Sequence, residues 1–253
     1  MRYMTIGFKR RVSLVLLPID DFTDRVITGS QLRMYLEEGG RPSIRKPDGY
    51  HVFCDLEGSA ARICIEGPLY QKQTVELPLG GMATVYQVRM LPNASYPIPS
   101  GATCIRGRLK PGSRIRLFFP EQKKSYKLLY DYDPEEKGLS LSLFNPELVP
   151  LEGKTLCICS REKEEFFRVK GQAEEICELE EPLQESYRKI GTSIYPVYEA
   201  FAEADGGFYL PIRSIPVESG NCVVRIAEGD GQQERCLTLT LTAGKENRIA
   251  EEF

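Results

Sequence analysis

The chain has 253 residues, of which 42% are apolar, and its 33 basic and 36 acidic side chains give a net charge of −3. This composition is typical of a globular protein of roughly one to three domains, and the lack of a basic stripe argues against nucleic acid as a partner. The apolar run 12–19 is too short to cross a membrane, and Asp20 and Asp21 follow it in place of a signal-peptide cleavage site. We therefore expect no membrane insertion and a cytoplasmic location.

Short runs in which apolar and polar residues alternate dominate the chain, and Gly, Pro, Asp and Asn separate them. Alternation with period two predicts strands that are buried on one face. The window 172–189 is the one stretch with a helix-like pattern, and because Pro182 divides it we expect only a short helical or irregular connector there. Predicted strands cover 13–19, 31–37, 50–56, 61–67, 73–79, 83–91, 103–109, 114–119, 126–132, 139–144, 154–160, 192–201, 207–212, 222–228 and 236–242.

Asp-Gly turns precede two of these strands. Asp48 and Gly49 come before YHVF, and Asp205, Gly206 and Gly207 come before FYLPI. Such pairs favour tight turns, because Gly adopts positive φ at little cost and the Asp side chain bonds back to the backbone. Both turns open the same series of strand, loop, strand, polar turn and strand, which indicates repeated small β-sandwich modules.

These patterns predict an all-β fold of two to three small antiparallel β-sandwich modules in tandem. The first module would span 1–80 and a second β domain 81–171. Residues 172–253 would hold the connector and a C-terminal sandwich-like module. The middle copy is expected to be degenerate, because its turn residues are spread over Asp133 and Gly138.

A run of motifs crosses the first module. It consists of a D-x-T opening with a later Gly, a D-G turn followed by an aromatic residue, an L-x-G step, and a Tyr-containing turn before a V-x-L strand. These motifs are formed by Asp21, Thr23, Gly29, Asp48, Gly49, Tyr50, Leu56, Gly58, Tyr70, Val75 and Leu77. The run resembles the transthyretin-like or carboxypeptidase-regulatory-like β-sandwich, and residues 192–244 resemble it more loosely. The resemblance implies a module that is usually non-catalytic and serves as a folding support, a spacer or an assembly surface.

The arrangement of the whole chain, with its strand–DDFT–strand opening and its KPDGY turn, resembles accessory proteins of phage-tail-like contractile injection particles. This resemblance implies a non-enzymatic structural or interaction protein, a subunit of a larger intracellular assembly that docks through its β-modules. The expected partners are other protein subunits, including further copies of this chain. No cofactor is expected.

Catalytic devices of the Ser-His-Asp or Cys-His type need a histidine base, and His51 is the only histidine. We place its neighbours Tyr50 and Val52 in the core, so His51 should lie on the opposite strand face, toward solvent or a neighbouring strand. Cys54 should then lie on the face away from His51. We therefore predict that the protein is not an enzyme and has no catalytic residue.

Metal sites also find little support in the sequence. Cys157 and Cys159 should place both thiols on one face of a strand, but a zinc site needs about four ligands and no second pair lies nearby. Buried structural cysteines are favoured instead, and reduced thiols are favoured over a disulfide framework. Asp20, Asp21 and Asp24 lack the oxygen-rich loop of a calcium site and fit a turn at the end of a strand.

Candidate contact residues are Lys46, His51 and Tyr96. Tyr96 lies in the proline-rich segment 91–101, for which a stiff connector is favoured over a docking motif. The runs CLTLTLT and LSLSLF alternate Leu with Thr or Ser, so either could form an edge strand that offers its backbone to another chain.

Two other classes of function stay open. One is an adhesin or carbohydrate-binding module, which oxidised cysteines or a cleaved N-terminus would favour. The other is a carboxylate-based hydrolase, which a deep cleft with two close carboxylates would favour.

Overall fold

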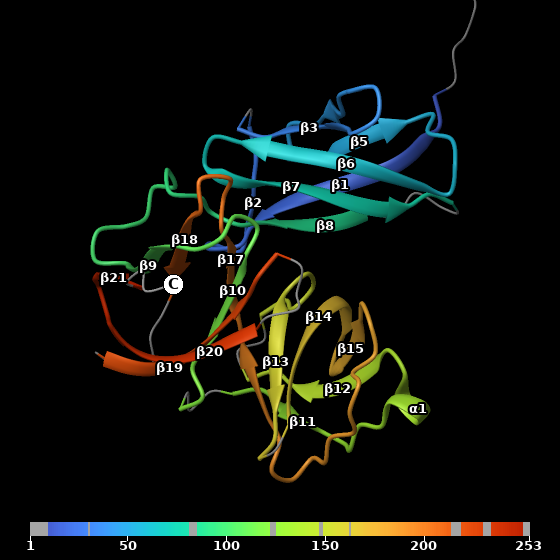
Figure 1. Ribbon diagram of the computed structural model, residues 1–253. Helices are drawn as coiled ribbons and strands as arrows, with labels where there is room; N and C mark the ends of the chain where they lie inside the picture. Colours follow the sequence, from blue (N-terminus) through green and yellow to red (C-terminus); the bar gives the residue numbers. More distant parts are fainter. Residues whose placement is uncertain are drawn as a thin grey trace, which may run out of the picture. The chain divides into compact units, whose positions relative to one another are not determined.

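A computed structural model describes residues 10–29, 31–80, 85–121, 125–146, 149–161, 163–213, 219–229 and 234–249. Within these ranges the protein has 21 strands, and its one helix, α1 (Pro134–Lys137), has 4 residues. The all-β prediction is confirmed. None of the described residues belongs to a helix long and apolar enough to pass through a membrane. The chain forms two compact units, Met1–Met90 (unit 1) and Leu91–Phe253 (unit 2), and Figure 1 labels their strands.

Unit 1 is a β-sandwich. One sheet holds β1, flanked on one edge by β8 and on the other by β5 and β2, with β4 beyond β5. The second sheet has the order β3-β6-β7. The strands are β1 (Val12–Asp20), β2 (Arg25–Val26), β3 (Arg33–Leu36), β4 (Ile44–Arg45), β5 (His51–Cys54), β6 (Ala60–Gly67), β7 (Tyr70–Pro78) and β8 (Val85–Met90). Alternate residues of both sheets meet in its core, including Leu14, Leu16, Met34, Phe53, Ile63 and Ile65.

Unit 2 contains a second sandwich. One sheet has the order β18-β9-β21 and the other β17-β10-β19-β20. The strands are β9 (Thr103–Arg108), β10 (Arg114–Phe118), β17 (Tyr198–Phe201), β18 (Gly207–Ile212), β19 (Ser219–Ala227), β20 (Glu234–Thr242) and β21 (Glu246–Arg248). Its core draws on both sheets, with Ile105, Ile115, Leu117, Leu210, Val224 and Ile226 all buried.

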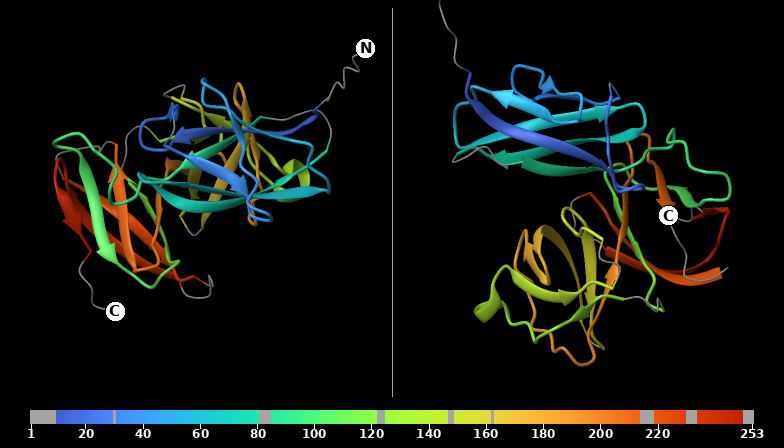
Figure 2. Two further views of the ribbon diagram at one scale, coloured as in Figure 1. Left: turned by 90° about the horizontal axis from the view of Figure 1, so that it is seen from above. Right: turned by 180° about the vertical axis from the view of Figure 1, so that it is seen from behind.

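The rest of unit 2 is a closed barrel. Its sheet has the order β11-β12-β15-β14-β13-β16, and reciprocal backbone hydrogen bonds between Tyr126 and Ile194, of 2.9 and 3.1 Å, join the two ends. The strands are β11 (Lys127–Leu128), β12 (Ser140–Phe144), β13 (Thr155–Cys159), β14 (Glu164–Ala173), β15 (Ile176–Leu179) and β16 (Ser193–Pro196). A separate core fills the barrel, and Leu143, Leu156, Ile158, Val169 and Leu179 belong to it. Figure 2 shows the barrel strands from two further directions.

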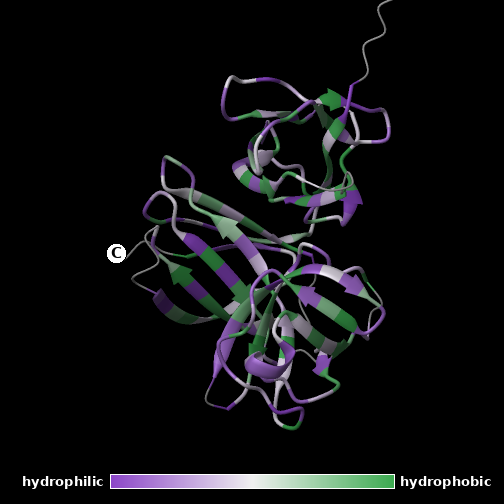
Figure 3. Ribbon diagram, turned by 90° about the vertical axis from the view of Figure 1, so that its right-hand side faces the viewer, coloured by the Kyte–Doolittle hydropathy of each residue, from purple (hydrophilic) through white to green (hydrophobic). Residues whose placement is uncertain are grey.

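Hydropathy alternates along most of these strands, as the striped ribbons of Figure 3 show. In β13, for example, Leu156 and Ile158 point into the barrel core, while Cys157 and Cys159 point outward. Alternation of this kind fixes which face of each strand is buried, because a slip of one residue would expose the whole apolar row.

The two sandwiches share one topology. In each, a first strand (β1 or β9) pairs antiparallel with the strand after the Asp-Gly turn (β5 or β18) and parallel with the last strand (β8 or β21). In each, a hairpin (β6 with β7, or β19 with β20) extends the other sheet from β3 or β10. The sandwich of unit 2 therefore repeats the topology of unit 1.

The barrel is an insertion in the second copy. After β3 the chain of unit 1 turns at residues 37–40 and returns beside the same strand, where Tyr35 bridges to Pro42. The equivalent return strand in unit 2 is β17, which pairs with β10, and strands β11 to β16 lie between those two in the sequence. A short loop of one copy thus corresponds to a whole barrel in the other.

The sheet pairings divide the chain differently from the sequence-based boundaries. β8 lies beyond residue 80 but pairs with β1, and unit 1 accordingly continues to Met90. β10 lies within the segment 81–171 but pairs with β17 and β19 of the segment 172–253. The boundaries were placed at glycines and at a break in the alternation, and neither feature marks a change of sheet.

The window 172–189 contains no helix. Its first half holds the end of β14 and all of β15, joined by a turn in which Glu174 has a φ of 54°. Strand pairing prevails because alternation in β15 buries Cys177 and Leu179 completely in the barrel core. The second half, after Leu179, is irregular, as the sequence allows.

Candidate functional site

The two Asp-Gly turns have the same hydrogen-bond pattern. In the first, the Lys46 N–H donates to the carbonyl of Tyr50 (2.7 Å) and the Gly49 N–H to that of Lys46 (3.1 Å). In the second, the Glu203 N–H donates to the carbonyl of Gly207 (2.8 Å) and the Gly206 N–H to that of Glu203 (2.9 Å).

Gly49 and Gly206 close these turns with φ of 93° and 82°, in the left-handed region that favours glycine. Asp48 and Asp205 are exposed, and the Asp205 carboxylate accepts a hydrogen bond from the Gly207 N–H (2.9 Å). All six residues expected in turns therefore lie in the two hydrogen-bonded turns that lead into β5 and β18, and Gly207 is also the first residue of β18.

The expected orientation of His51 is wrong. His51 is 3% exposed and Phe53 2%, whereas Tyr50, Val52 and Cys54 are only half-buried. The strand starts with the opposite phase because the Tyr50 carbonyl closes the turn by accepting from the Lys46 N–H, and His51, the first residue of β5, enters the sandwich. His51 and Cys54 still lie on opposite faces, as alternation requires.

Burial holds His51 in its neutral form. The cost of desolvating an imidazolium, reinforced by the nearby Arg45 cation, lowers its pKa from 6.5 to about 4. Its Nδ1 shares a hydrogen bond with the Ser43 hydroxyl at 2.8 Å. His51 is therefore a satisfied core residue and has no surface with which to contact a partner.

The other two candidate contact residues lie in turns. Lys46 is exposed in the first Asp-Gly turn. Tyr96 is half-buried at the end of a turn in which its N–H donates to the Asn93 carbonyl (3.0 Å), while the Asn93 side chain accepts from the Ser95 N–H (2.9 Å). The three candidates are thus separated between a surface turn, a core and a connector.

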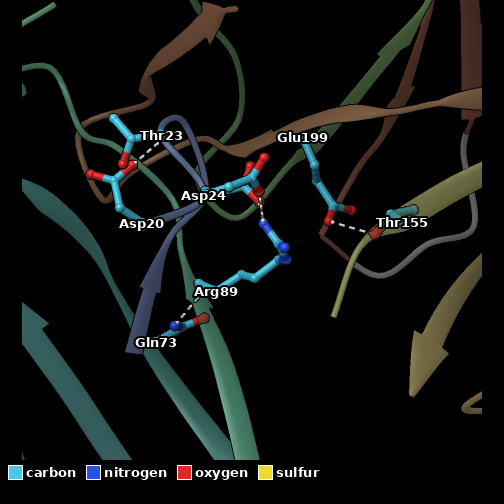
Figure 4. A network of polar contacts seen from close by, with 8 residues as sticks. Asp20, Thr23, Asp24, Gln73, Arg89, Thr155 and Glu199 are labelled. Carbon is cyan, nitrogen blue, oxygen red and sulfur yellow. Dashed lines mark hydrogen bonds and ion pairs between the residues drawn. The ribbon is translucent and has the colours of Figure 1, made fainter. Parts of the chain in front are cut away.

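The acidic DDFTD segment forms a turn at the end of β1, as the sequence predicts. Asp20 is buried and accepts hydrogen bonds from the Thr23 N–H (2.9 Å) and the Tyr70 hydroxyl (2.8 Å). Arg89, itself 5% exposed, lies 2.8 Å from the Asp24 carboxylate. Figure 4 draws this contact. A buried cation therefore pairs with two carboxylates of this acidic turn, those of Asp21 and Asp24, which gives the turn a structural role.

The two equivalent edge strands differ in chemistry. β7 and β20 each have 9 residues and alternate exposed with half-buried side chains. The exposed row of β7 includes Lys72, Glu76 and Pro78, whereas the exposed row of β20 from Cys236 to Thr242 has no charge and no proline. Among the described strands β20 pairs with β19 alone.

A thiol cluster lies on the outer face of the barrel. The sulfurs of Cys157 and Cys159 are 3.3 Å apart, and a Glu164 carboxylate oxygen lies within 4.8 Å of both. Within the described chain this is the one group of three side chains with metal-ligand chemistry so close together. The hydrogen bond with Cys159, together with burial, raises the pKa of the Cys157 thiol far above its usual range.

The second sandwich covers this cluster. The Arg225 guanidinium on β19 donates to Glu164 at 2.7 Å, and that hydrogen bond raises the pKa of Arg225. Beside it, Phe118 of β10 stacks on Tyr195 of β16 with ring centroids 5.6 Å apart and meets Phe166 edge-on at 6.2 Å. Polar and aromatic contacts thus join barrel and sandwich within unit 2.

A polar groove of unit 2 brings two carboxylates to that same junction. Glu165 accepts hydrogen bonds from the Gln184 N–H (2.7 Å) and the Tyr187 hydroxyl (3.0 Å). Glu199 accepts from Arg116 Nε (3.1 Å) and from the Thr155 hydroxyl (3.4 Å; Figure 4). Glu199 therefore links β17 of the sandwich to β13 of the barrel, whereas Glu165 anchors the barrel segment 184–187. The groove is also lined by Arg114, Phe166, Arg168, Glu180 and Phe201.

Sequence reasoning missed Glu164 and Arg225 as neighbours of the C-x-C pair. Glu164 could have been found, because a hairpin turn after β13 brings it opposite Cys159 in the β13–β14 ladder. Arg225 gave no signal, because 61 residues separate it from Glu164 and only the insertion of the barrel brings the two together.

Comparison with known proteins identifies no family. No family model and no curated protein matches the chain. Among solved structures, a DUF3823 family protein from Bacteroides ovatus is 11% identical, with a TM-score of 0.27, and the match covers 94% of this chain and all of that one. The major pilin subunit BcpA of Bacillus cereus is 10% identical (TM-score 0.24), with 92% of this chain and 69% of that chain covered.

The shaft pilin SpaA of Lactobacillus rhamnosus GG is 8% identical, with a TM-score of 0.22 and coverage of 95% and 96%. Similarities at this level carry no inference about function.

Proposed function

We propose that this protein is a non-enzymatic structural or interaction protein, a subunit of a larger protein assembly, and that it binds an extended strand of another protein chain along β20. The observation that carries the proposal is the unprotected edge of β20. An edge strand is a ready template for another chain, and sheet proteins usually block such edges with charges, prolines or bulges.

Backbone direction supports docking at this edge. Thr242 directs its N–H and its carbonyl to the Asn247 side chain, at 3.0 and 3.2 Å. Alternate residues of an antiparallel strand direct their backbone groups to the same side, so Thr240, Thr238 and Cys236 direct theirs to the same edge. Their three N–H and three carbonyl groups can form a new ladder with a partner strand.

The hairpin registers show what protects the equivalent strand in unit 1. Ser43 and Ala200 each lie three residues before the matching turn positions Lys46 and Glu203. The Ser43 N–H donates to the Met34 carbonyl, and Ala200 pairs with Ile115, so Met34 and Ile115 are equivalent.

From Met34 and Ile115 onward, the strand pairings of the two sandwiches correspond residue by residue. Met34 pairs with Ile65 and Ile115 with Ile226. Three residues before Ile65 and Ile226, Arg62 pairs with Glu76 and Val223 pairs with Thr238. Two residues earlier again, Ala60 pairs with Pro78 and Asn221 pairs with Thr240. Thr238 and Thr240 thus occupy the positions that a charge and a proline hold in β7.

The resemblance to accessory proteins of phage-tail-like contractile injection particles supports such a particle as the assembly. On this proposal the protein acts in the cytoplasm, and its partners are other protein subunits or further copies of this chain. The transthyretin-like resemblance of the first module agrees with a supporting role.

Site-specific photo-crosslinking tests the proposal in cells that naturally make the protein. A photo-reactive amino acid replaces Thr240 on β20 and, as a control that keeps Glu76 and Pro78 in place, the exposed Thr74 on β7. The proposal predicts a discrete heavier adduct from Thr240 and none from Thr74. The double variant Thr238→Glu, Thr240→Pro transfers the chemistry of β7 to β20 and should abolish the interaction. It should leave the β19–β20 ladder intact, because the backbone N–H that proline removes at position 240 faces the free edge. Equal adducts from both strands, or none from Thr240, would contradict the proposal.

A further inference from the structure

The thiol cluster on the outer face of the barrel is independent of the docking edge on β20. We propose that Cys157, Cys159 and Glu164 bind one Zn²⁺ ion, with the fourth position of the metal open to water or to a ligand from another molecule.

The strand geometry presents the three ligands together. Cys157 and Cys159 are two residues apart in β13, so both side chains leave the same face of the strand. Glu164 is the direct cross-strand partner of Cys159 in β14. The three ligand atoms lie within 4.8 Å of one another, so a single ion at about 2.3 Å from sulfur and about 2.0 Å from oxygen needs only side-chain rotation to reach all three.

Charge balance favours a divalent ion. Without metal, two neutral thiols lie beside the Glu164–Arg225 ion pair, and the total charge is zero. Zn²⁺ binding replaces the two thiol protons, which pass to solvent, so two thiolates, one carboxylate, one guanidinium and one Zn²⁺ again sum to zero. A monovalent ion such as Cu⁺ would leave a net negative charge at a largely buried site, which is costly.

The chemistry of the three ligands also favours Zn²⁺ over other metal ions. Thiolates select Zn²⁺ and copper over Mg²⁺ and Ca²⁺, which prefer oxygen ligands, and a carboxylate in the set suits Zn²⁺ better than Cu⁺. The sequence argued against a zinc site here because no second cysteine pair lies nearby. The β13–β14 hairpin supplies the missing third ligand.

The ion can reach the site from solvent. Cys157 is fully buried, but Cys159 is half-buried and the Glu164 side chain is 24% exposed. Arg225, whose side chain is 27% exposed, can keep one hydrogen bond to Glu164 through the carboxylate oxygen that does not face the ion. That contact would orient the carboxylate toward the metal, as partners beyond the ligands commonly do.

Cobalt substitution of the full-length, reduced protein tests the proposal. Co²⁺ bound to thiolate gives a charge-transfer absorption that water-bound Co²⁺ lacks, and Zn²⁺ should displace it. We expect one metal ion per chain by native mass spectrometry. Because Cys157→Ser could unfold the barrel, the decisive variants are Cys159→Ser and Glu164→Gln at partly exposed positions, which should weaken binding at least tenfold.

The matched control is Cys54→Ser, at a half-buried thiol on β5 of unit 1, which should bind Co²⁺ like the unmodified protein. A folded, reduced protein without the charge-transfer band would overturn the proposal. So would a band that persists unchanged in Cys159→Ser or that disappears in Cys54→Ser.

Discussion

The sandwich of unit 1 and the sandwich of unit 2 have the same strands in the same pairing, yet they differ where each could meet another chain. In unit 1 the edge strand β7 has Glu76 and Pro78, and in unit 2 the equivalent positions of β20 are Thr238 and Thr240. One fold can therefore be closed to strand addition in one copy and open in the other, because edge protection depends on a few exposed side chains and not on topology.

The outer faces of the same sheets differ as well. Cys64 of β6 corresponds to Arg225 of β19, since each lies one residue before the buried isoleucine that pairs with Met34 or Ile115. In unit 1 the Cys64 thiol contacts the Thr74 hydroxyl at 3.5 Å, whereas in unit 2 Arg225 binds Glu164 of the inserted barrel. In the second copy, this position of the outer face thus contacts the inserted barrel.

The two Asp-Gly turns should differ most in their tolerance of a side chain. A Cβ on Gly206 would lie 2.6 Å from the Leu109 backbone carbonyl oxygen, while one on Gly49 would lie 2.7 Å from Cγ1 of Val26 and farther, 3.0 Å, from the nearest backbone carbonyl oxygen, that of Ile27. Both positions also impose left-handed strain of about 1–3 kcal/mol. We expect Gly206→Ala to lower the free energy of unfolding by about 4 kcal/mol and Gly49→Ala by about 2 kcal/mol, measured by urea denaturation. Equal losses would show that the close carbonyl is irrelevant.

Acid should destabilise unit 1 through His51, whose counterpart after the second turn is the apolar Phe208. The pKa of His51 falls from 6.5 to about 4 on folding, so the unfolded chain takes up the proton first as the pH drops. The neutral imidazole makes its full contribution to the free energy of unfolding above pH 6.5. This contribution decreases toward pH 4 and is about 2.5 kcal/mol lower at pH 4.5.

NMR titration of the single imidazole checks the pKa directly. Urea denaturation at pH 7 and pH 4.5, compared between the unmodified protein and His51→Gln, checks the linked stability. An imidazole that titrates near 6.5 in the folded protein would contradict the buried neutral state.

Removing the edge protection of β7 should make unit 1 resemble unit 2. The variant Glu76→Thr, Pro78→Thr gives β7 the side chains of β20 and frees one backbone N–H, so we expect about tenfold stronger self-association by analytical ultracentrifugation. Glu76→Gln alone is the control, because it keeps Pro78. If the double variant behaves like this control, proline and charge do not protect the edge.

The smallest expected effect concerns the barrel contact that unit 1 lacks. Arg225→Met keeps much of the side-chain volume but leaves Glu164 without its cation, and we expect a loss of about 1 kcal/mol, given the partial exposure of both groups. The loss should vanish in the background of Glu164→Gln, which a double-mutant cycle measures. A loss that persists there would assign the effect to packing against Arg225.

Local patterns predicted the strands and the two Asp-Gly turns, because alternation and turn chemistry depend on neighbours in sequence. The phase of β5 was missed, since whether Tyr50 or His51 enters the core depends on how the turn joins the sheet. The discontinuity of the second sandwich was also missed, because β10 and β17 pair across the whole barrel sequence. The contact of Arg225 with Glu164 depends on that insertion and has no local signal.

The central claim, docking through β20, is tested most directly by size-exclusion chromatography of fresh lysates from cells that naturally make the protein. We expect the unmodified chain to elute in a complex much larger than its 28.6 kDa, and the variant Thr238→Glu, Thr240→Pro, expressed at the same level and equally folded, to elute as a free monomer. Elution of the unmodified chain as a monomer in every condition, or of both proteins in the same large complex, would contradict the claim.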